Sequence, residues 1–186
     1  GPQQVRDPVF SPDGERIAFF ARDYVGQAFR LYVVDVDGAN LQSILDAHYS
    51  TAENLSWSPD GRSLIYDRFE PWDGFTSIYR VDLETETEVR LIEFGYAGRY
   101  SPDGTMIAYD SASGVRVARA ADGSDPVTIT TMFGNPAWSP DGRRIAVNYG
   151  ASGANEGITV FDVDGTRVQR VHGVAWEVAQ YPVWSS

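Results

Sequence analysis

One short motif, Ser-Pro-Asp-Gly, recurs along the sequence and constrains the fold more than any other feature. Complete copies begin at Ser11, Ser58, Ser101 and Ser139. The interval between copies is roughly forty to fifty residues, the length of a repeat unit in arrays and propellers. Each copy follows an aromatic residue and precedes an apolar run, and part of a fifth copy begins at Pro182. The sequence therefore predicts a series of small similar units, each packed on its neighbours.

Each repeat predicts four antiparallel strands. The motif suits a tight turn between the first two strands, because proline presets φ and glycine adopts the left-handed conformation. The third strands, with apolar residues in period two, are expected at 31–35, 78–82, 115–118 and 158–162. Shorter fourth strands are expected at 41–44, 89–92, 127–130 and 168–171. Since no stretch has a helical period, the predicted fold class is all-β.

Charge and composition argue against several classes of partner and site. The net charge is -11, which disfavours binding to the phosphate backbone of a nucleic acid. No apolar run reaches the ~20 residues of a transmembrane helix, so no membrane insertion is expected. Cysteine is absent, so the sequence offers no disulfide, thiolate nucleophile or zinc-thiolate site.

The repeat resembles the WD40-like PD40 repeat of TolB-type β-propellers. The resemblance rests on aromatic-Ser-Pro-Asp-Gly, on the Ile-Ala-aromatic strand that follows it, and on Leu-Tyr-Val-Val-Asp-x-Asp-Gly at 31–38. It covers nearly the whole chain. The resemblance implies four-stranded blades packed radially around a channel, with roughly six to eight blades in a ring. The residues define no cellular compartment, and the resemblance alone favours a periplasmic or secreted protein.

Four repeats and one further strand are fewer than such a ring contains. Residues 1–6 are expected to be a cloning scar or an N-terminal tail. The blades are expected at about 7–53, 54–96, 97–134 and 135–180, with an extra inner strand at 181–186. The chain is therefore expected to form part of a larger ring or of a homo-oligomeric one, and the simplest closure is a two-fold dimer.

The resemblance also implies that the loops of the blades form two faces, and binding residues are expected to gather on one of them. The Ser-Pro-Asp-Gly and Asp-Gly turns share one face, whereas the aromatic-rich links between second and third strands and between blades share the other. Binding residues concentrate in loops on a rigid scaffold. The least repeat-like link is 67–75, with Trp72 near its middle. The candidate binding residues are Phe69, Glu70, Trp72, Asp73, Phe75, Tyr49, Tyr96, Phe133, Tyr149 and Trp176. Alternatively, these rings cover the neighbouring blade.

The serines and aspartates of the motif are interpreted as structural, because one Ser-x-Asp on each tight turn is a folding device. They are Ser11, Asp13, Ser58, Asp60, Ser101, Asp103, Ser139 and Asp141. The sequences at 35–38 and 162–165 resemble the start of a calcium loop but lack its later carboxylates. His48 and His172 have no metal-ligand spacing, so no metal or cofactor is expected.

No catalytic residue is predicted. The sequence contains no Gly-x-Ser-x-Gly, and no spacing argument supports a Ser-His-Asp triad. The favoured function is non-catalytic recognition of a protein, peptide or glycan by the aromatic loop face. Two alternatives stay open: a substrate-screening propeller domain of an α/β-hydrolase-type peptidase, and a propeller fragment that self-assembles into a ring.

Overall fold

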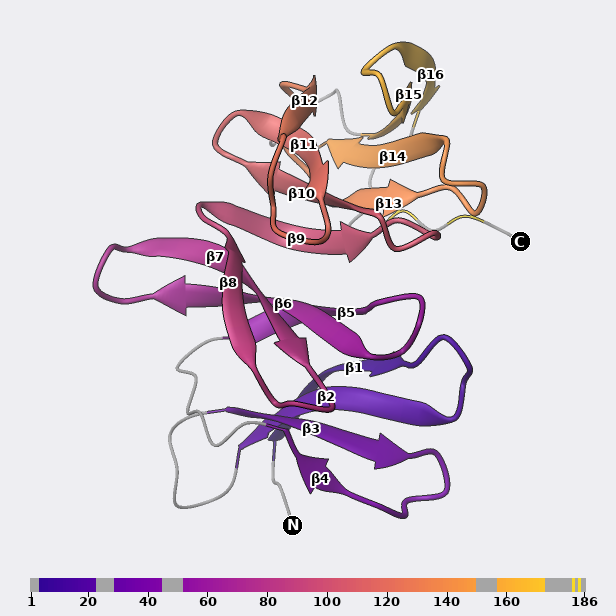
Figure 1. Cartoon of the computed structure of the whole chain (residues 1–186). Helices are drawn as coiled ribbons and strands as arrows, with labels where there is room; N and C mark the ends of the chain where they lie inside the picture. The colour runs from indigo at the N-terminus through magenta and orange to yellow at the C-terminus, as the bar shows by residue number, and fades with distance from the viewer. Residues whose placement is uncertain are drawn as a thin grey trace. The chain divides into compact units, whose positions relative to one another are not determined.

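The described part of the chain folds into sixteen β-strands (Figure 1). The computed structural model describes residues 4–22, 29–44, 52–149, 157–172, 182 and 184. Within these residues the strands form four four-stranded sheets. No helix in the described part of the chain is long and apolar enough to cross a membrane. The prediction of an all-β fold built from four four-stranded blades is confirmed.

Each sheet corresponds to one repeat and is called a blade. Blade 1 contains β1 (Gln4–Phe10), β2 (Arg16–Arg22), β3 (Arg30–Asp35) and β4 (Gln42–Ser43). Blade 2 contains β5 (Ala52–Trp57), β6 (Ser63–Glu70), β7 (Phe75–Asp82) and β8 (Glu88–Ile92). Blade 3 contains β9 (Gly95–Tyr100), β10 (Met106–Ser111), β11 (Gly114–Arg119) and β12 (Val127–Thr130). Blade 4 contains β13 (Pro136–Trp138), β14 (Arg144–Tyr149), β15 (Gly157–Asp162) and β16 (Arg167–His172).

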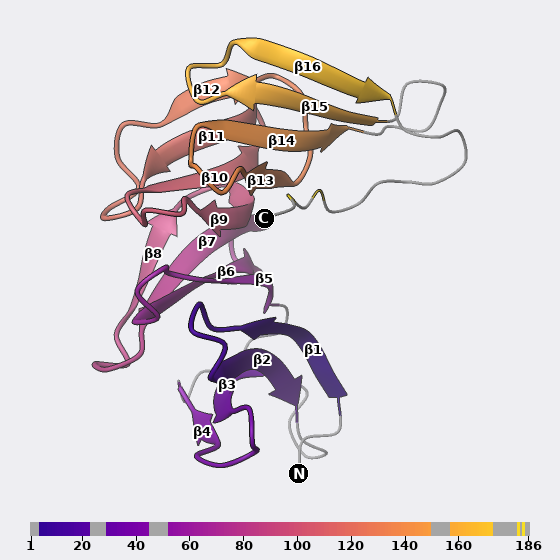
Figure 2. The same ribbon diagram turned by 90° about the vertical axis from the view of Figure 1, so that its right-hand side faces the viewer.

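The strands of each blade are hydrogen-bonded in chain order, as Figure 2 shows for β13 to β16. Neighbouring strands are antiparallel; β6 and β7, for example, pair from Ser63↔Asp82 to Glu70↔Phe75. In such a meander the first and third turns lie at one end of the blade and the second turn at the other (Figure 1). The first strand begins at Gln4, which pairs with Arg22, and so starts before residue 7, where the sequence placed the first blade.

The blades group into two compact units, Gly1–Tyr96 and Ala97–Ser186. In the first unit, blades 1 and 2 bury a shared core in which the Phe20 ring meets the edge of the Tyr66 ring at 5.5 Å. In the second unit, the core between blades 3 and 4 includes Val115, Ile145 and Val147, all fully buried. Packing of apolar strand faces is what holds each pair of blades together.

The first turn of each blade has one geometry, repeated four times. In blade 2 the Ser58 hydroxyl donates to Asp60 Oδ1 at 2.6 Å and accepts from the Ser63 backbone N–H at 2.9 Å. Gly61 N donates to Ser58 O at 2.9 Å, which closes the turn. The four serines are buried, at 3–6% exposure, and the aspartates are exposed. The hydroxyl therefore links the aspartate to the start of the second strand.

These turns predict a loss of stability in acid. Asp13, Asp60, Asp103 and Asp141 have a pKa below the ordinary value. The hydrogen bond from the serine hydroxyl is the largest cause, and a hydrogen bond from a backbone N–H is the second. A carboxyl whose pKa is lower in the folded state adds stability above its unfolded pKa, ~3.9, and this stability is lost as pH falls through the folded pKa. We expect the urea concentration at the midpoint of unfolding to decrease when the pH is lowered below about 4. Asp60→Asn should make this fall shallower, and an unchanged slope in this variant would contradict the assignment.

Candidate binding surface

The β6–β7 hairpin carries the most exposed large apolar side chain of the described residues. Trp72 lies in its turn and is 72% exposed. Gly74 N donates to Glu70 O at 2.8 Å, and Phe75 N donates to Asp73 Oδ1 at 2.9 Å, so the turn is closed by its own hydrogen bonds. The hairpin lies at the end of blade 2 opposite to the Ser58 turn (Figure 1). The sequence assigned Asp73 to binding, and the structure places its carboxylate in this turn.

A second exposed ring of this hairpin is Phe75, the first residue of β7, and it contacts Phe94, which follows β8. Phe75 and Phe94 meet edge to face, with ring centroids 4.7 Å apart, and are 54% and 48% exposed. We call Trp72, Phe75 and Phe94 the hairpin patch. Phe69, 40% exposed, lies on the opposite face of the hairpin because successive strand residues alternate and Glu70, not Phe69, is paired with Phe75. The structure therefore separates Phe69 from the Phe75–Phe94 pair.

A buried polar network lies at the base of the same hairpin. Glu70 Oε1 accepts from Arg68 Nη2 at 2.8 Å, from Arg68 Nε at 3.0 Å and from the Tyr79 hydroxyl. Arg68 Nη1 also donates to Glu88 Oε2 at 2.8 Å, and the Tyr66 hydroxyl donates to the other oxygen of Glu88. The Arg68 guanidinium lies 3.6 Å from the centre of the Tyr79 ring. Burial, reinforced by the Glu70 contact, raises the pKa of Tyr79.

This network corrects the expectation for Glu70. The sequence placed Glu70 among surface binding residues, but its side chain is 1% exposed and lies on the face of blade 2 that also carries Tyr66 and Tyr79. A carboxylate is stable in such a place only when it is paired and hydrogen-bonded. Glu70 is paired directly with Phe75 across the strands. The network therefore stabilises the base of the hairpin that carries the exposed rings.

Of the other predicted binding residues, the structure describes the side chains of Tyr96 and Phe133. Tyr96 is 39% exposed near the start of β9, and Phe133 is 55% exposed in the second unit, which is described separately. Tyr49 and Trp176 lie outside the described residues, as does the side chain of Tyr149. Among the described residues no group of three or more acidic or histidine side chains could hold a metal ion.

The tryptophans that precede a motif serine have a role that the sequence did not reveal. The Trp57 indole N–H donates to Val9 O of blade 1 at 3.2 Å. Trp138 donates in the same way to Arg99 O of blade 3 at 3.0 Å, and Trp184 to Ala137 O of blade 4 at 3.1 Å. Each tryptophan thus bonds to the inner strand of the preceding blade. Tryptophan at this position was the available signal, because indole is the aromatic group with a dedicated N–H donor.

The repeated four-stranded blades and their turns agree with one known family. Its model, described as the TolB beta propeller domain, PD40, matches residues 2–186. The chain belongs to the PD40 family. The resemblance drawn from the Ser-Pro-Asp-Gly repeats is therefore confirmed.

Relatives of this PD40 chain include an enzyme and two TolB structures. "Uncharacterized peptidase YuxL" of Bacillus subtilis is 27% identical over 166 residues, which cover 88% of this chain and 24% of the peptidase. Putative TolB from Agrobacterium tumefaciens has a TM-score of 0.76 at 24% identity, covering 91% of this chain and 65% of that one. TolB from Acinetobacter baumannii has a TM-score of 0.71 at 23% identity, covering 90% and 43%. The PD40 chain thus spans about a quarter of the peptidase and less than two thirds of either TolB.

Proposed function

We propose that this chain is a non-catalytic recognition module that binds a protein or peptide partner through the hairpin patch. The single observation that carries the proposal is the exposure of Trp72, Phe75 and Phe94 together, at 72%, 54% and 48%. Clustered exposed rings mark interaction sites, whereas scattered apolar residues on a surface need no explanation. Tryptophan in particular is enriched among the residues that dominate binding energy.

The rigidity of the support adds to this argument. The rings stand on a hairpin whose turn is closed by backbone hydrogen bonds and whose base contains the Arg68–Glu70–Tyr79 network. A partner therefore does not have to order the loop when it binds, and this lowers the entropic cost of association.

Trp72→Ala tests the proposal. Peptides are selected from a random displayed library on the wild-type chain, and their affinities are measured by calorimetry for both proteins. We expect the substitution to weaken binding by about 2 kcal/mol, roughly 30-fold, because Trp72 acts as the anchor. Thermal unfolding should be unchanged because the side chain is mostly exposed.

Phe133→Ala is the matched control, since Phe133 is an exposed ring at 55% in the other unit. It should leave the affinity of the selected peptides unchanged. Equal losses in both variants, or a library that yields no binder, would contradict the proposal. A glycan array screened in parallel would identify a carbohydrate partner, which would also overturn the proposal in this form.

The relationship to the Bacillus peptidase favours one second candidate, a substrate-screening propeller joined to a peptidase domain. The support is the 27% identity over 88% of this chain. Its test is the coding sequence that adjoins this segment in the parent gene. A Gly-x-Ser-x-Gly nucleophile turn there would favour the peptidase, and further blades alone would favour a binding module.

Self-association of the chain is a further part of the proposal. Phe10 stands at the position of Trp57 and Trp138, yet it is 67% exposed, and Val5 on the same strand is 52% exposed. An inner strand that exposes these two apolar side chains is suited to cover another blade, and a second copy could supply one in a symmetric ring. We expect light scattering at micromolar concentration to give more than 20.5 kDa, and Phe10→Glu to lower the mass. A concentration-independent mass of 20.5 kDa would contradict self-association.

A further inference from the structure

Arg16 fills the space between blades 1 and 2 on the side of the Ser-Pro-Asp-Gly turns. Its Nη2 donates to Gly61 O of blade 2 at 2.8 Å. Its guanidinium lies 4.9 Å from the centre of the Trp57 ring, and Trp57 is only 7% exposed. The position between blades 1 and 2 therefore combines an aromatic face with a glycine carbonyl, and the Arg16 guanidinium binds both.

The equivalent position between blades 3 and 4 of the second unit lacks the arginine. Arg16 is the fifth residue after Ser11, and the fifth residue after Ser101 is Met106. Trp138 and Gly142 correspond to Trp57 and Gly61, because each precedes or follows the motif serine by the same number of residues. Blades 3 and 4 thus keep the aromatic ring and the glycine, while an uncharged thioether replaces the guanidinium.

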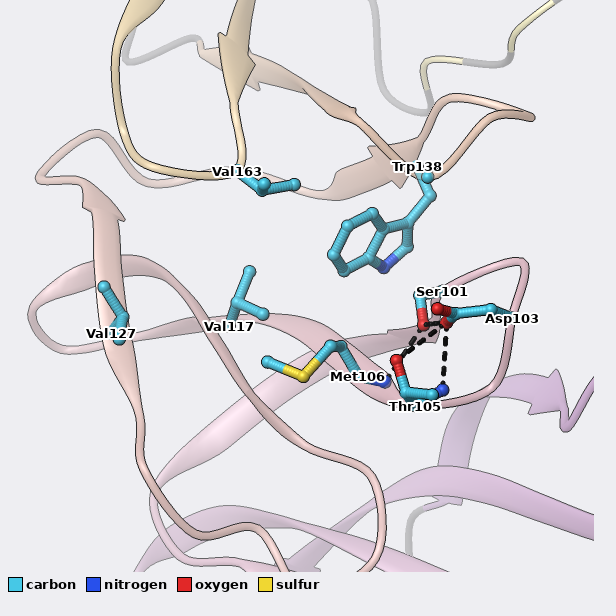
Figure 3. A pocket seen from close by; sticks show the side chains of 9 residues that line it. Ser101, Asp103, Thr105, Met106, Val117, Val127, Trp138 and Val163 are labelled. Carbon is cyan, nitrogen blue, oxygen red and sulfur yellow. Dashed lines mark hydrogen bonds between the residues drawn. The ribbon is translucent and has the colours of Figure 1, made fainter.

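A pocket of about 210 Å³ lies at this position (Figure 3). The Trp138 ring borders it, with Met106 and Val117 on the blade 3 side, and Val127 and Val163 at its outer end. Trp138 is only half-buried, in contrast to the covered Trp57. The volume is below the ~300 Å³ at which pockets for drug-sized ligands begin, and it suits a single side chain.

An acidic group lies at the other end of the pocket. Asp103 lines it and accepts from Ser101 Oγ at 2.6 Å, Thr105 Oγ1 at 2.9 Å and Thr105 N at 3.0 Å, all on Oδ1. These bonds hold the pKa of Asp103 below its usual range, so the group is a carboxylate at neutral pH. The pocket therefore has an apolar wall, an aromatic face and an anion.

We propose that this pocket binds the arginine side chain of a partner protein or peptide. The aliphatic part of the arginine would pack on Met106, Val117 and Val163. Its guanidinium would lie over Trp138, within reach of the Gly142 carbonyl and the Asp103 carboxylate, as Arg16 lies over Trp57 in blades 1 and 2. The net charge of -11 also attracts cationic partners. This inference is independent of the hairpin patch, because it concerns the other unit.

The direct test is nuclear magnetic resonance of the indole N–H groups, with N-acetyl-arginine amide as the probe. The Trp138 N–H is a good reporter, since it is held by Arg99 O at 3.0 Å next to the pocket. We expect its signal to shift with saturation at a Kd on the order of 1 mM, as for a ligand of this small size. N-acetyl-citrulline amide, of nearly the same shape but uncharged, should bind at least about tenfold more weakly.

Two substitutions interchange the arginine and the methionine at the two interblade positions. Met106→Arg puts the chain's own guanidinium against Trp138 and should abolish the shift. Arg16→Met removes the guanidinium from Trp57, so the same probe should now perturb the Trp57 signal, which it leaves unchanged in the wild type. If Met106→Arg does not fold, Val127→Trp blocks the outer end from a position that is 55% exposed.

Three outcomes would overturn the inference. The first is no shift of the Trp138 signal at probe concentrations well above the expected Kd. The second is equal binding of the arginine and citrulline probes, since the pocket would then not recognise charge. The third is a shift of the Trp138 signal that persists in folded Met106→Arg or in Val127→Trp.

Discussion

Replacing Arg68 by methionine is expected to destabilise the chain by about 3–5 kcal/mol, because it leaves a buried carboxylate without its cation. The Glu70 side chain is 1% exposed and that of Arg68 is 18% exposed. Glu70 Oε2 is already buried and accepts no hydrogen bond from the described residues, so all of the compensation is made at Oε1. The substitution also removes the cation between Glu70 and Glu88 and leaves two like charges near each other. Urea unfolding monitored by tryptophan fluorescence measures the loss.

Arg90→Met is the matched control for this prediction. Arg90 pairs with Glu93, but both side chains are exposed, at 38% and 56%. Exposed ion pairs contribute ~0–1 kcal/mol, so this variant should remain close to the wild type. The double variant Arg68→Met/Glu70→Gln should recover part of the loss, because no charge is then buried alone. If it recovers nothing, the loss comes from the missing Arg68–Tyr79 packing, and our explanation is wrong.

Gly114→Ala is expected to destabilise the second unit by about 3 kcal/mol or more, through a clash that the backbone cannot avoid. Gly114 begins β11 with φ at +97°, where only glycine is unstrained. A Cβ there would lie 2.2 Å from Thr130 O and 2.6 Å from Thr131 Cα. Both contacts are backbone atoms, so β11 and β12 would have to separate. Thermal and urea unfolding measure the effect.

Gly142→Ala separates the clash from the strain of positive φ. Gly142 has φ at +68°, but the nearest atom to its Cβ would be Pro102 Cδ at 3.6 Å, an ordinary contact. Only the left-handed conformation is then penalised, at about 1–2 kcal/mol. The prediction for Gly114 therefore requires a clearly larger loss there than at Gly142. Similar losses would show that the strands adapt to the extra carbon.

The repeat pattern of the sequence was sufficient to predict the blades. Proline, glycine and the alternation of apolar residues act over a few neighbouring positions, so the turns and strands follow from local chemistry. The expected third strand at 78–82 lies within β7, and the expected fourth strand at 127–130 coincides with β12. Exposure of Trp72 also agrees with its place in an insertion between two strands.

The candidate site could be predicted only in part, because pairing across strands decides which way a side chain points. The sequence placed Phe69 and Glu70 in one link, but both lie at the end of β6, where one is 40% exposed and the other is buried. The partners of Glu70 are Arg68 and Tyr79, and the tyrosine is supplied by the next strand. No spacing rule indicates such a pairing before the register of β6 and β7 is known.

The sequence by itself determined the all-β blades, their turns and the family, since these depend on short-range patterns that each repeat carries independently. Only the tertiary structure decided which side chains contact one another between blades. The bonds from Trp57 to Val9 and from Trp138 to Arg99 join residues from different repeats. The same is true of Arg16, which reaches Gly61, and of Met106, which borders a pocket with Trp138. These contacts depend on the distance and orientation between two packed sheets. Local sequence patterns do not specify either quantity.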